Sequence, residues 1–164
     1  MAIQVVLLRH GIAQDEGENG DDASRKLTET GIEKLKKRLP HLKELVDNVN
    51  DTYIWSSPLT RARETAMILG ETVGVKDVIY LNFIGNGVYH EFYEMLKHVS
   101  DNTTIFVVGH EPYLSHWAWE LGKIHLAFKK GGAACFKMEY QNPKNVSLEW
   151  SLDPREMENL DEEE

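Results

Sequence analysis

The stretch VVLLRHGIAQ, residues Val5–Gln14, contains the pattern that decides the fold. Four aliphatic residues end abruptly in Arg9, His10 and Gly11. A short, continuous apolar run that ends at polar residues is typical of a strand buried on both faces of a parallel sheet. We therefore predict a buried strand over residues 3–8 whose carboxyl end carries a cation and an imidazole.

Strand-like and helix-like patterns alternate along the rest of the chain. Further strands are expected at residues 52–57, 77–81, 103–110, 133–140 and 147–152, and helices at residues 28–45, 58–74, 90–99 and 112–122. This order predicts an α/β fold, a three-layer sandwich with a mainly parallel central sheet and helices on both faces. The last two strands follow each other without a helix, so we expect a hairpin across residues 141–145 and an antiparallel strand at the sheet edge.

A capping residue and three prolines indicate where helices begin or change direction. Thr28 is a suitable cap for the first helix, and Pro40 within that helix is expected to bend or split it. Pro58 is expected to be the first residue of the second helix and Pro112 to open the last one, since proline suits the first helical position.

The length and charge of the chain indicate one acidic domain. The 164 residues contain 18 Lys and Arg against 27 Asp and Glu, a net charge of −9. Six of the acids and one base fall within residues 155–164, which we expect to form a frayed, solvated acidic tail after a domain at residues 1–154. The short basic runs are no footprint for nucleic acid, so no such partner is expected.

The sequence favours a cytoplasmic location. Cys135 is the only cysteine, which rules out an internal disulfide and fits a reducing compartment. The apolar run near the N-terminus is too short for a signal peptide and lacks a basic region before it. No segment has the length needed to span a membrane, so a membrane partner is not expected either.

Chemically active side chains follow three of the predicted strands. Arg9 and His10 end the first strand, Ser57 ends the second with Arg61 one helical turn further, and His110 ends the fourth. Ligands of open α/β sheets bind at the carboxyl ends of the strands. The two arginines and two histidines should therefore meet at one edge of the sheet.

Two guanidinium groups and two imidazoles suit the transfer of a phosphoryl group. Guanidinium binds phosphate oxygens through paired hydrogen bonds, and histidine can act as a nucleophile and as a proton carrier near neutral pH. Pro58 at a helix start would also direct free backbone N–H groups at an anion. No carboxylate or cysteine lies at ligand spacing to complete a metal site, and two arginines would repel a cation. We therefore expect no metal and no other cofactor.

Three motifs together resemble the histidine phosphatase superfamily, also called the phosphoglycerate mutase-like family. They are RHG at residues 9–11, SSPLTRARETA at residues 56–66 and VVGHEP at residues 107–112. RKLTETG at residues 25–31 and KKGGAACFKMEY at residues 129–140 are similar to its small phosphohistidine phosphatase branch. The resemblance implies a hydrolase that removes phosphate from phosphohistidine on a signalling protein through a covalent phosphohistidine intermediate.

The resemblance also implies roles for the matching residues. His10 would be the phosphorylated nucleophile, its other ring nitrogen held by the Gly11 carbonyl, and His110 would share the phosphate pocket with two arginines. Ser57 is either a turn residue or a further phosphate donor. We therefore expect His10 and His110 to be catalytic, and Arg9, Arg61, Gly11 and Ser57 to bind phosphate.

The general acid is left open by the sequence. Many members of the family carry a Glu or Asp after the third strand, which protonates the leaving group. The corresponding stretch here, residues 82–96, contains Glu91 and Glu94, but both lie within a helical pattern. Glu111, beside His110, is a further candidate.

Three functions fit these residues. The leading one is a phosphohistidine phosphatase that acts on a protein, because no long insertion forms a lid between the strands. The alternative is a phosphatase or mutase for a small phosphorylated metabolite. A protein that only binds phosphorylated partners would keep the arginines without needing His10.

Outside the site, Cys135 is expected to be packed in the core, and Arg63 and Arg25 to lie at the surface or in ion pairs, with Arg25 also placed to rim the pocket.

Overall fold

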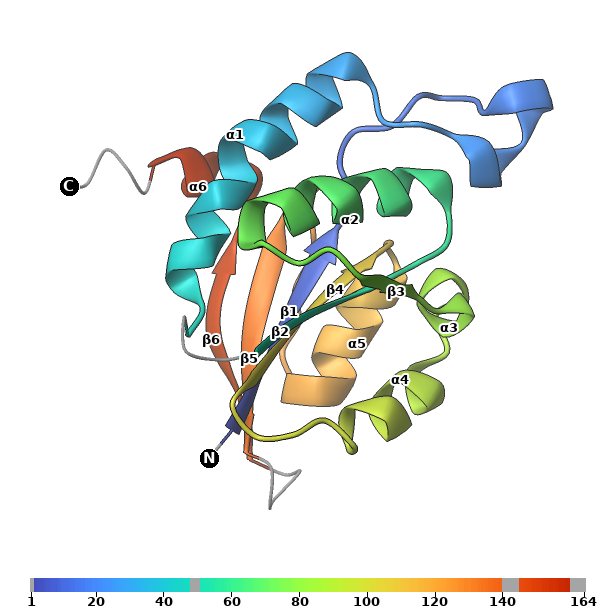
Figure 1. Cartoon of the computed structure of the whole chain (residues 1–164). Helices are drawn as coiled ribbons and strands as arrows, with labels where there is room; N and C mark the ends of the chain where they lie inside the picture. Colours follow the sequence, from blue (N-terminus) through green and yellow to red (C-terminus); the bar gives the residue numbers. More distant parts are fainter. Residues whose placement is uncertain (1, 48–50, 140–144, 160–164) are drawn as a thin grey trace.

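The computed structural model describes residues 2–47, 51–139 and 145–159, which form a six-stranded sheet between two layers of helices (Figure 1). The strands are β1 Ala2–Arg9, β2 Asp51–Ser56, β3 Val78–Tyr80, β4 Thr103–Gly109, β5 Ala133–Glu139 and β6 Val146–Leu152. They lie in the order β3-β2-β4-β1-β5-β6, parallel from β3 to β1 and antiparallel from β1 to β6. The predicted α/β fold is confirmed, with two antiparallel strands on one side.

Helices cover both faces of the sheet. α1 Glu29–Leu45, α2 Thr60–Val73 and α6 Pro154–Asn159 lie on one face, and α3 Asn82–Asn86, α4 Tyr89–Leu96 and α5 Tyr113–Gly122 on the other. Two short 3-10 turns, Glu18–Gly20 and Asp22–Ser24, lie in the long connection from β1 to α1. The fold therefore has two apolar cores, one on each side of the sheet.

The central strand β1 contributes to both cores. Val5 and Leu7 pack with residues of α4 and α5, whereas Val6 and Leu8 pack with residues of α1 and α2. Because successive side chains point to opposite faces, a strand between two helical layers needs apolar residues at every position. This explains why the sequence shows a continuous run there and not an alternating one.

Helix α1 is a single helix despite its internal proline. Its start agrees with the prediction, because the Thr28 hydroxyl oxygen accepts the backbone N–H of Gly31 at 2.9 Å. Pro40 does not split the helix. Leu39 and Leu42 on either side of it are fully buried against the sheet, and this packing offsets the one backbone hydrogen bond that proline removes.

The start of the second helix, α2, differs from the prediction that was based on Pro58. α2 begins at Thr60, two residues later than expected, because the Ser57 hydroxyl accepts the N–H of Leu59 and the chain stays extended there. Pro58 therefore directs no helical N–H groups at an anion. The short helix α3 was not expected at all, since its five residues are too few to show a helical period.

The last described helix, α6, packs against the domain. Asp153 Oδ1 accepts the backbone N–H groups of Arg155 and Glu156 at 2.9 and 3.0 Å, at the start of α6. Met157 is fully buried in the core with residues of α1. The prediction of a solvated tail from residue 155 is therefore wrong for this helix, because one apolar side chain among the acids anchors it.

Some predicted features fall at the limits of the described residues. The loop of the expected hairpin lies mostly outside them, as do residues 160–164, but β5 and β6 do pair in antiparallel fashion. Cys135 in β5 is buried, as predicted. Within the described part of the chain, no helix is both long and apolar enough to cross a membrane.

Candidate functional site

The carboxyl ends of β1, β2 and β4 bring two histidines together. β1 and β4 run parallel with Arg9 opposite Gly109, so the next residues, His10 and His110, lie side by side. The backbone N–H of His10 donates to the Gly109 carbonyl at 3.1 Å, and the centroids of the two imidazole rings are 5.1 Å apart. We refer to His10, His110, Arg9, Arg61 and Ser57 as the histidine cluster.

His10 is buried and held in one orientation. The residue is 6% exposed, and its Nδ1 lies 2.7 Å from the Gly11 carbonyl oxygen. A carbonyl can only accept, so we assign the ring proton to Nδ1 and the free lone pair to Nε2. Burial lowers the pKa of His10 to about 4. The hydrogen bond to Gly11 opposes this effect, and the charges of Arg61 and Arg9 add to it. The ring is therefore neutral at pH 7 and its Nε2 can act as a nucleophile.

Gly11 orients His10 and does not offer its N–H to a ligand. That N–H donates to Thr65 Oγ1 at 3.1 Å, and the Thr65 hydroxyl donates to the Arg61 carbonyl at 2.8 Å. A Cβ on Gly11 would lie 2.7 Å from Leu35 Cδ1, so a side chain there would have to displace that buried leucine. These contacts give Gly11 a positioning role, and the phosphate-binding role expected of it stays a prediction. Thr65 was missed, although it lies one helical turn after Arg61 in the same motif.

Arg9 is fixed by a chain of contacts that includes Glu111. Arg9 NH1 donates to the Phe128 carbonyl at 2.8 Å, and the Phe128 N–H donates to Glu111 Oε2 at 3.1 Å. The backbone N–H and the hydroxyl of Ser115 also donate to the Glu111 carboxylate. Burial lowers the pKa of Arg9, and the charge of Glu111 opposes this effect. Glu111, a candidate acid, thus serves to hold the backbone that positions Arg9.

Arg61 enters the cluster from the first turn of α2. The residue is 8% exposed. Its NH1 donates to the Asp22 carbonyl at 3.0 Å and its NH2 to Asp22 Oδ2 at 3.3 Å. Asp22 was not expected here, because it belongs to a polar loop whose sequence shows no period and no known motif.

His110 is held by Ser57 from the neighbouring strand. It is 5% exposed, and its Nε2 lies 2.7 Å from Ser57 Oγ. Because Ser57 Oγ accepts the Leu59 N–H at 3.2 Å, its own proton is available to His110 Nε2, and Nδ1 then carries the ring proton. Burial, then the proximity of His10 and Arg61, lowers the pKa of His110 to about 3, with Asp22 opposing. Ser57 therefore positions His110, and a direct bond to phosphate is not required of it.

Three polar atoms of the cluster are buried without a hydrogen-bond partner among the described residues. They are Arg9 Nε, Arg61 Nε and His110 Nδ1. A buried donor left unpaired costs about 1–3 kcal/mol, so native proteins rarely leave several together unless a ligand, an ion or water satisfies them. Two of the three belong to guanidinium groups, whose charges act on the neutral imidazole of His10. This arrangement is suited to an anion with several acceptor oxygens.

The family of the chain follows from comparison with known proteins. A model of the histidine phosphatase superfamily (branch 1) matches residues 5–83, from within β1 to just after β3, with the motifs of His10 and Arg61. An uncharacterized protein from Picosynechococcus sp. is 31% identical over 137 residues, covering 79% of this chain and 82% of that protein. The chain belongs to the histidine phosphatase superfamily.

Solved structures share the fold of this superfamily member. The protein histidine phosphatase SixA, complexed with tungstate, matches with a TM-score of 0.78 and 21% identity, over 94% of this chain and 99% of that one. A protein described as SixA from Nakamurella multipartitia gives 0.75 and 22%, over 94% and 97%. A phosphoserine phosphatase mutant from Entamoeba histolytica, in complex with phosphoserine, gives 0.69 and 15%, over 93% and 98%. At these identities the matches show a shared fold and leave the substrate unassigned.

The remaining candidate acids lie apart from the cluster. Glu94 forms an ion pair with Lys97 at 2.8 Å and its side chain is 45% exposed. Glu91 is exposed on the same helix, α4. Among the described residues, no hydrogen bond or ion pair joins either glutamate to the histidines. Nor does any group of three or more His, Cys, Asp or Glu side chains in that part of the chain suit a metal ion.

The other residues singled out in the sequence have ordinary structural roles or lie at the rim. Arg25 forms an ion pair with Asp22 at 3.1 Å beside the cluster. Arg63 is exposed, and its guanidinium lies 4.7 Å from the centre of the Tyr80 ring. Arg25 thus lies at the rim, whereas Arg63 contacts Tyr80 at the end of β3.

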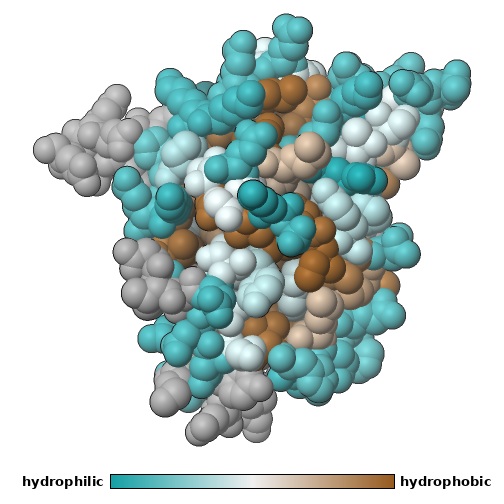
Figure 2. All heavy atoms as spheres, viewed as in Figure 1, coloured by the Kyte–Doolittle hydropathy of each residue, from teal (hydrophilic) through white to brown (hydrophobic). Residues whose placement is uncertain are grey.

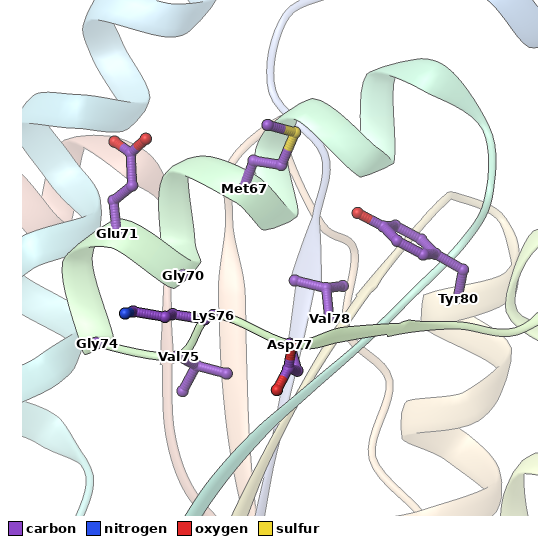
Figure 3. Close-up of a pocket in the computed structure, with 9 residues that line it drawn as sticks. All are labelled: Met67, Gly70, Glu71, Gly74, Val75, Lys76, Asp77, Val78 and Tyr80. Atoms are coloured by element: carbon purple, nitrogen blue, oxygen red, sulfur yellow. The ribbon is translucent and has the colours of Figure 1, made fainter.

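A cavity lies elsewhere on this histidine phosphatase fold (Figure 3). Its volume is about 670 Å³, and it is lined by Met67, Gly70, Glu71, Gly74, Val75, Lys76, Asp77, Val78 and Tyr80, from α2, the turn after it and β3. Hydrophobic side chains reach the surface in the view of Figure 2. Met67, one of the lining residues, is 58% exposed. None of the lining residues belongs to the histidine cluster, so the cavity is separate from the candidate site.

Proposed function

We propose that this protein is a phosphatase that removes phosphate from phosphohistidine on a protein, through a covalent phosphohistidine at His10. The observation that supports it most is the set of buried, unpaired atoms Arg9 Nε, Arg61 Nε and His110 Nδ1 beside a neutral His10 ring. These atoms match the oxygens of a phosphoryl group, and the ring supplies the nucleophile.

In the first step, His10 Nε2 forms a bond to phosphorus while the P–N bond of the substrate breaks. The electron pair of that bond goes to the departing substrate imidazole. Charge on the three equatorial oxygens is stabilised by the two guanidinium groups and by His110 Nδ1–H, which are already in place and need no reorganisation. The proton on His10 Nδ1 stays on the ring, bonded to the Gly11 carbonyl.

In the second step, water attacks phosphorus and the bond to His10 Nε2 breaks. The Gly11 carbonyl keeps Nδ1 protonated throughout, so the electron pair returns to Nε2 and His10 leaves as a neutral imidazole and not as an imidazolate anion. The water proton goes to solvent or to the product phosphate. The bond between Nδ1 and Gly11 thus makes His10 both a nucleophile and a leaving group.

The surroundings of the cluster favour phosphohistidine over phosphate esters. An ester releases an alkoxide, which needs a proton from an acid as it departs. Phosphohistidine releases neutral imidazole once its second ring nitrogen is protonated, and free histidine takes up that proton from water with a pKa of about 6.5. Glu111 is occupied by three donors and Glu94 by Lys97. A site arranged in this way can serve an imidazole leaving group without a dedicated acid.

Covalent labelling tests the central step. The protein is incubated with ³²P-labelled phosphoramidate, a small P–N donor, and quenched in alkali. We expect acid-labile, alkali-stable label on the peptide that contains His10. The His10→Ala variant should take up no label, and His98→Ala, which changes an exposed histidine, should label normally. Binding of a phosphohistidine peptide with no label would mean that the protein is only a binding module.

A series of leaving groups tests the substrate class. We expect kcat/KM to be highest for a phosphohistidine peptide, to fall steeply across aryl phosphates of rising leaving-group pKa and to be lowest for phosphoserine. Each tenfold drop corresponds to about 1.4 kcal/mol of barrier. A flat profile, or a preference for one small metabolite, would favour the alternative of a metabolite phosphatase or mutase.

We further propose that the reaction needs no metal and that the substrate is a signalling protein of the cytoplasm. The two arginines of the cluster supply the positive charge that a metal would otherwise bring to the phosphate. The buried, reduced Cys135 fits a reducing compartment. Activity should be unchanged after dialysis against EDTA. Loss of activity that Mg²⁺ or Zn²⁺ restores would overturn the metal-free mechanism.

A further inference from the structure

Arg61 of the histidine cluster is held by a residue from the loop between β1 and α1. Arg61 NH1 donates to the carbonyl oxygen of Asp22 at 3.0 Å, and Arg61 NH2 donates to the carboxylate of the same residue at 3.3 Å. The Arg61 side chain is 10% exposed, whereas that of Asp22 is 68% exposed. One exposed residue thus supplies two acceptors to a buried cation.

These two bonds leave one edge of the guanidinium free. A guanidinium has five N–H groups in a plane, which form two pairs of parallel donors. NH1 and NH2 form the pair at the end of the group, and Nε with the second N–H of NH2 forms the pair along its side. Asp22 occupies the end pair, while Nε in the side pair is buried without a partner among the described residues. The side pair is the one left to receive two phosphate oxygens.

The loop is built to keep Asp22 in this place. Arg25 NH1 contacts Asp22 Oδ1 at 3.1 Å, and Arg25 Nε donates to the Gln14 carbonyl at 2.6 Å on the other side of the loop. The Leu27 N–H donates to Glu64 Oε1 at 2.8 Å, which ties the end of the loop to α2. The hydrogen bond from Arg25 lowers the pKa of Asp22, so the carboxylate is ionised at neutral pH.

We infer that Asp22 is a positioning residue for phosphoryl transfer, which holds Arg61 by its end pair of donors so that the side pair faces the phosphoryl group. The inference rests on the proposed function, and it makes the 15–26 loop part of the site. Without the two bonds to Asp22, the Arg61 side chain would lose conformational entropy each time the transition state forms. The contribution of Asp22 is therefore to the rate of transfer and not to the affinity for the ground-state phosphate, because Asp22 itself carries a negative charge that repels the ligand.

The test is a double-mutant cycle with a matched loop control. Asp22→Ala should lower kcat for an aryl phosphate about tenfold, while KM and the inhibition constant of inorganic phosphate stay within about twofold or improve. Asp22→Asn should lie between, since its amide oxygen still accepts from NH2. Asp21→Ala removes the cap that Asp21 Oδ1 gives to the Ala23 N–H in the same turn but touches no arginine, and it should behave like the parent protein.

In the Arg61→Ala background, Asp22→Ala should have no further effect, because Asp22 acts through Arg61. An equal loss in both backgrounds, or an equal loss from Asp21→Ala, would overturn the inference in favour of a general role for the loop.

Side-chain ¹⁵N NMR gives a readout that does not depend on turnover. The Nε–H signal of Arg61 should shift on titration with inorganic phosphate and broaden in Asp22→Ala. If the protein proved to turn over no phosphorylated compound, the proposed function would fail while this signal still tested whether Asp22 holds Arg61.

Discussion

The ends of β1 and β4 carry one histidine each, side by side, but the protein holds the two rings in opposite ways. His10 is bonded through Nδ1 to the carbonyl of the next residue in its own chain segment, Gly11. His110 is bonded through Nε2 to the hydroxyl of Ser57 on another strand. A carbonyl only accepts, so it settles the tautomer of His10 directly, whereas the tautomer of His110 follows from the Leu59 N–H, which leaves the Ser57 hydroxyl to donate to Nε2.

This difference separates the roles of two otherwise similar residues. Both rings are buried and neutral at pH 7, with pKa values lowered to about 4 for His10 and about 3 for His110. His10 presents an unprotonated Nε2 and His110 an unpaired Nδ1. Under the proposed function we therefore expect His10 to attack phosphorus and His110 to hydrogen-bond to phosphate oxygens.

Replacing the two histidines in turn should show the largest contrast. His10→Ala should abolish turnover, by about ten-thousandfold or more in kcat/KM, because no other group can form the covalent intermediate. His110→Ala keeps the nucleophile and should retain covalent labelling, with a loss of about a hundredfold or more. Kinetics with an aryl phosphate and thermal unfolding check both. A folded His10→Ala protein with full activity would end the covalent mechanism.

Arg61, which lowers the pKa of both rings, offers the next test. Arg61→Ala should reduce kcat/KM by about a hundredfold or more, the scale for loss of one preorganised charged donor. Arg63→Ala, two residues along the same helix, should have a far smaller effect, since that side chain is exposed over Tyr80. Equal effects of the two changes on kcat/KM would show that Arg61 does not act in the phosphate pocket.

The hydroxyl that holds His110 can be removed without touching His10. Ser57→Ala should lower kcat/KM about tenfold, because His110 loses the bond that orients it. Ser56→Ala is the matched control, since Ser56 is equally buried but its hydroxyl donates to the Ser57 carbonyl and not to an imidazole. If Ser57→Ala and Ser56→Ala lost the same activity while both stayed equally stable, the bond from Ser57 to His110 would not explain the loss.

The smallest expected effect is on the pH dependence of stability. Both rings take up a proton in the unfolded chain near pH 6.5, but in the folded protein only near pH 4 and pH 3. Between these limits the unfolded state binds more protons, so the free energy of unfolding should fall as pH decreases from 6.5 toward 4, and this contribution should be constant above 6.5. The His10→Gln variant should show a shallower slope in urea titrations between pH 5 and 6.5. An unchanged slope would mean that His10 is protonated normally in the folded protein.

Local patterns predicted most of the sheet. The apolar runs at β1 and β4 predicted strands because burial on both faces of the sheet favours apolar residues at every position. The edge strand β6 and the antiparallel pairing of β5 could be expected from two strand patterns without an intervening helix. The short helices α3 and α6 could not, since five or six residues complete too few turns to show a period.

The contacts that orient the site were beyond local patterns. The sequence indicated that Arg61 lies in the pocket, but not that Asp22, 39 residues earlier, supplies both acceptors at the end of its guanidinium. Ser57 was expected as a turn residue or phosphate donor, and its bond to His110, 53 residues later, was not foreseen. The same is true of the bond from Gly11 to Thr65, 54 residues away.

By itself, the sequence determined that two histidines and two arginines follow the ends of parallel strands, and that such ends meet at one edge of a sheet. These conclusions depend on periodicity and chain order, which are properties of short segments and of their succession. Only the tertiary structure decided which atom of each side chain is held and which is left to face a ligand. That choice depends on partners distant in the chain, whose approach is set by how the helices pack on the sheet.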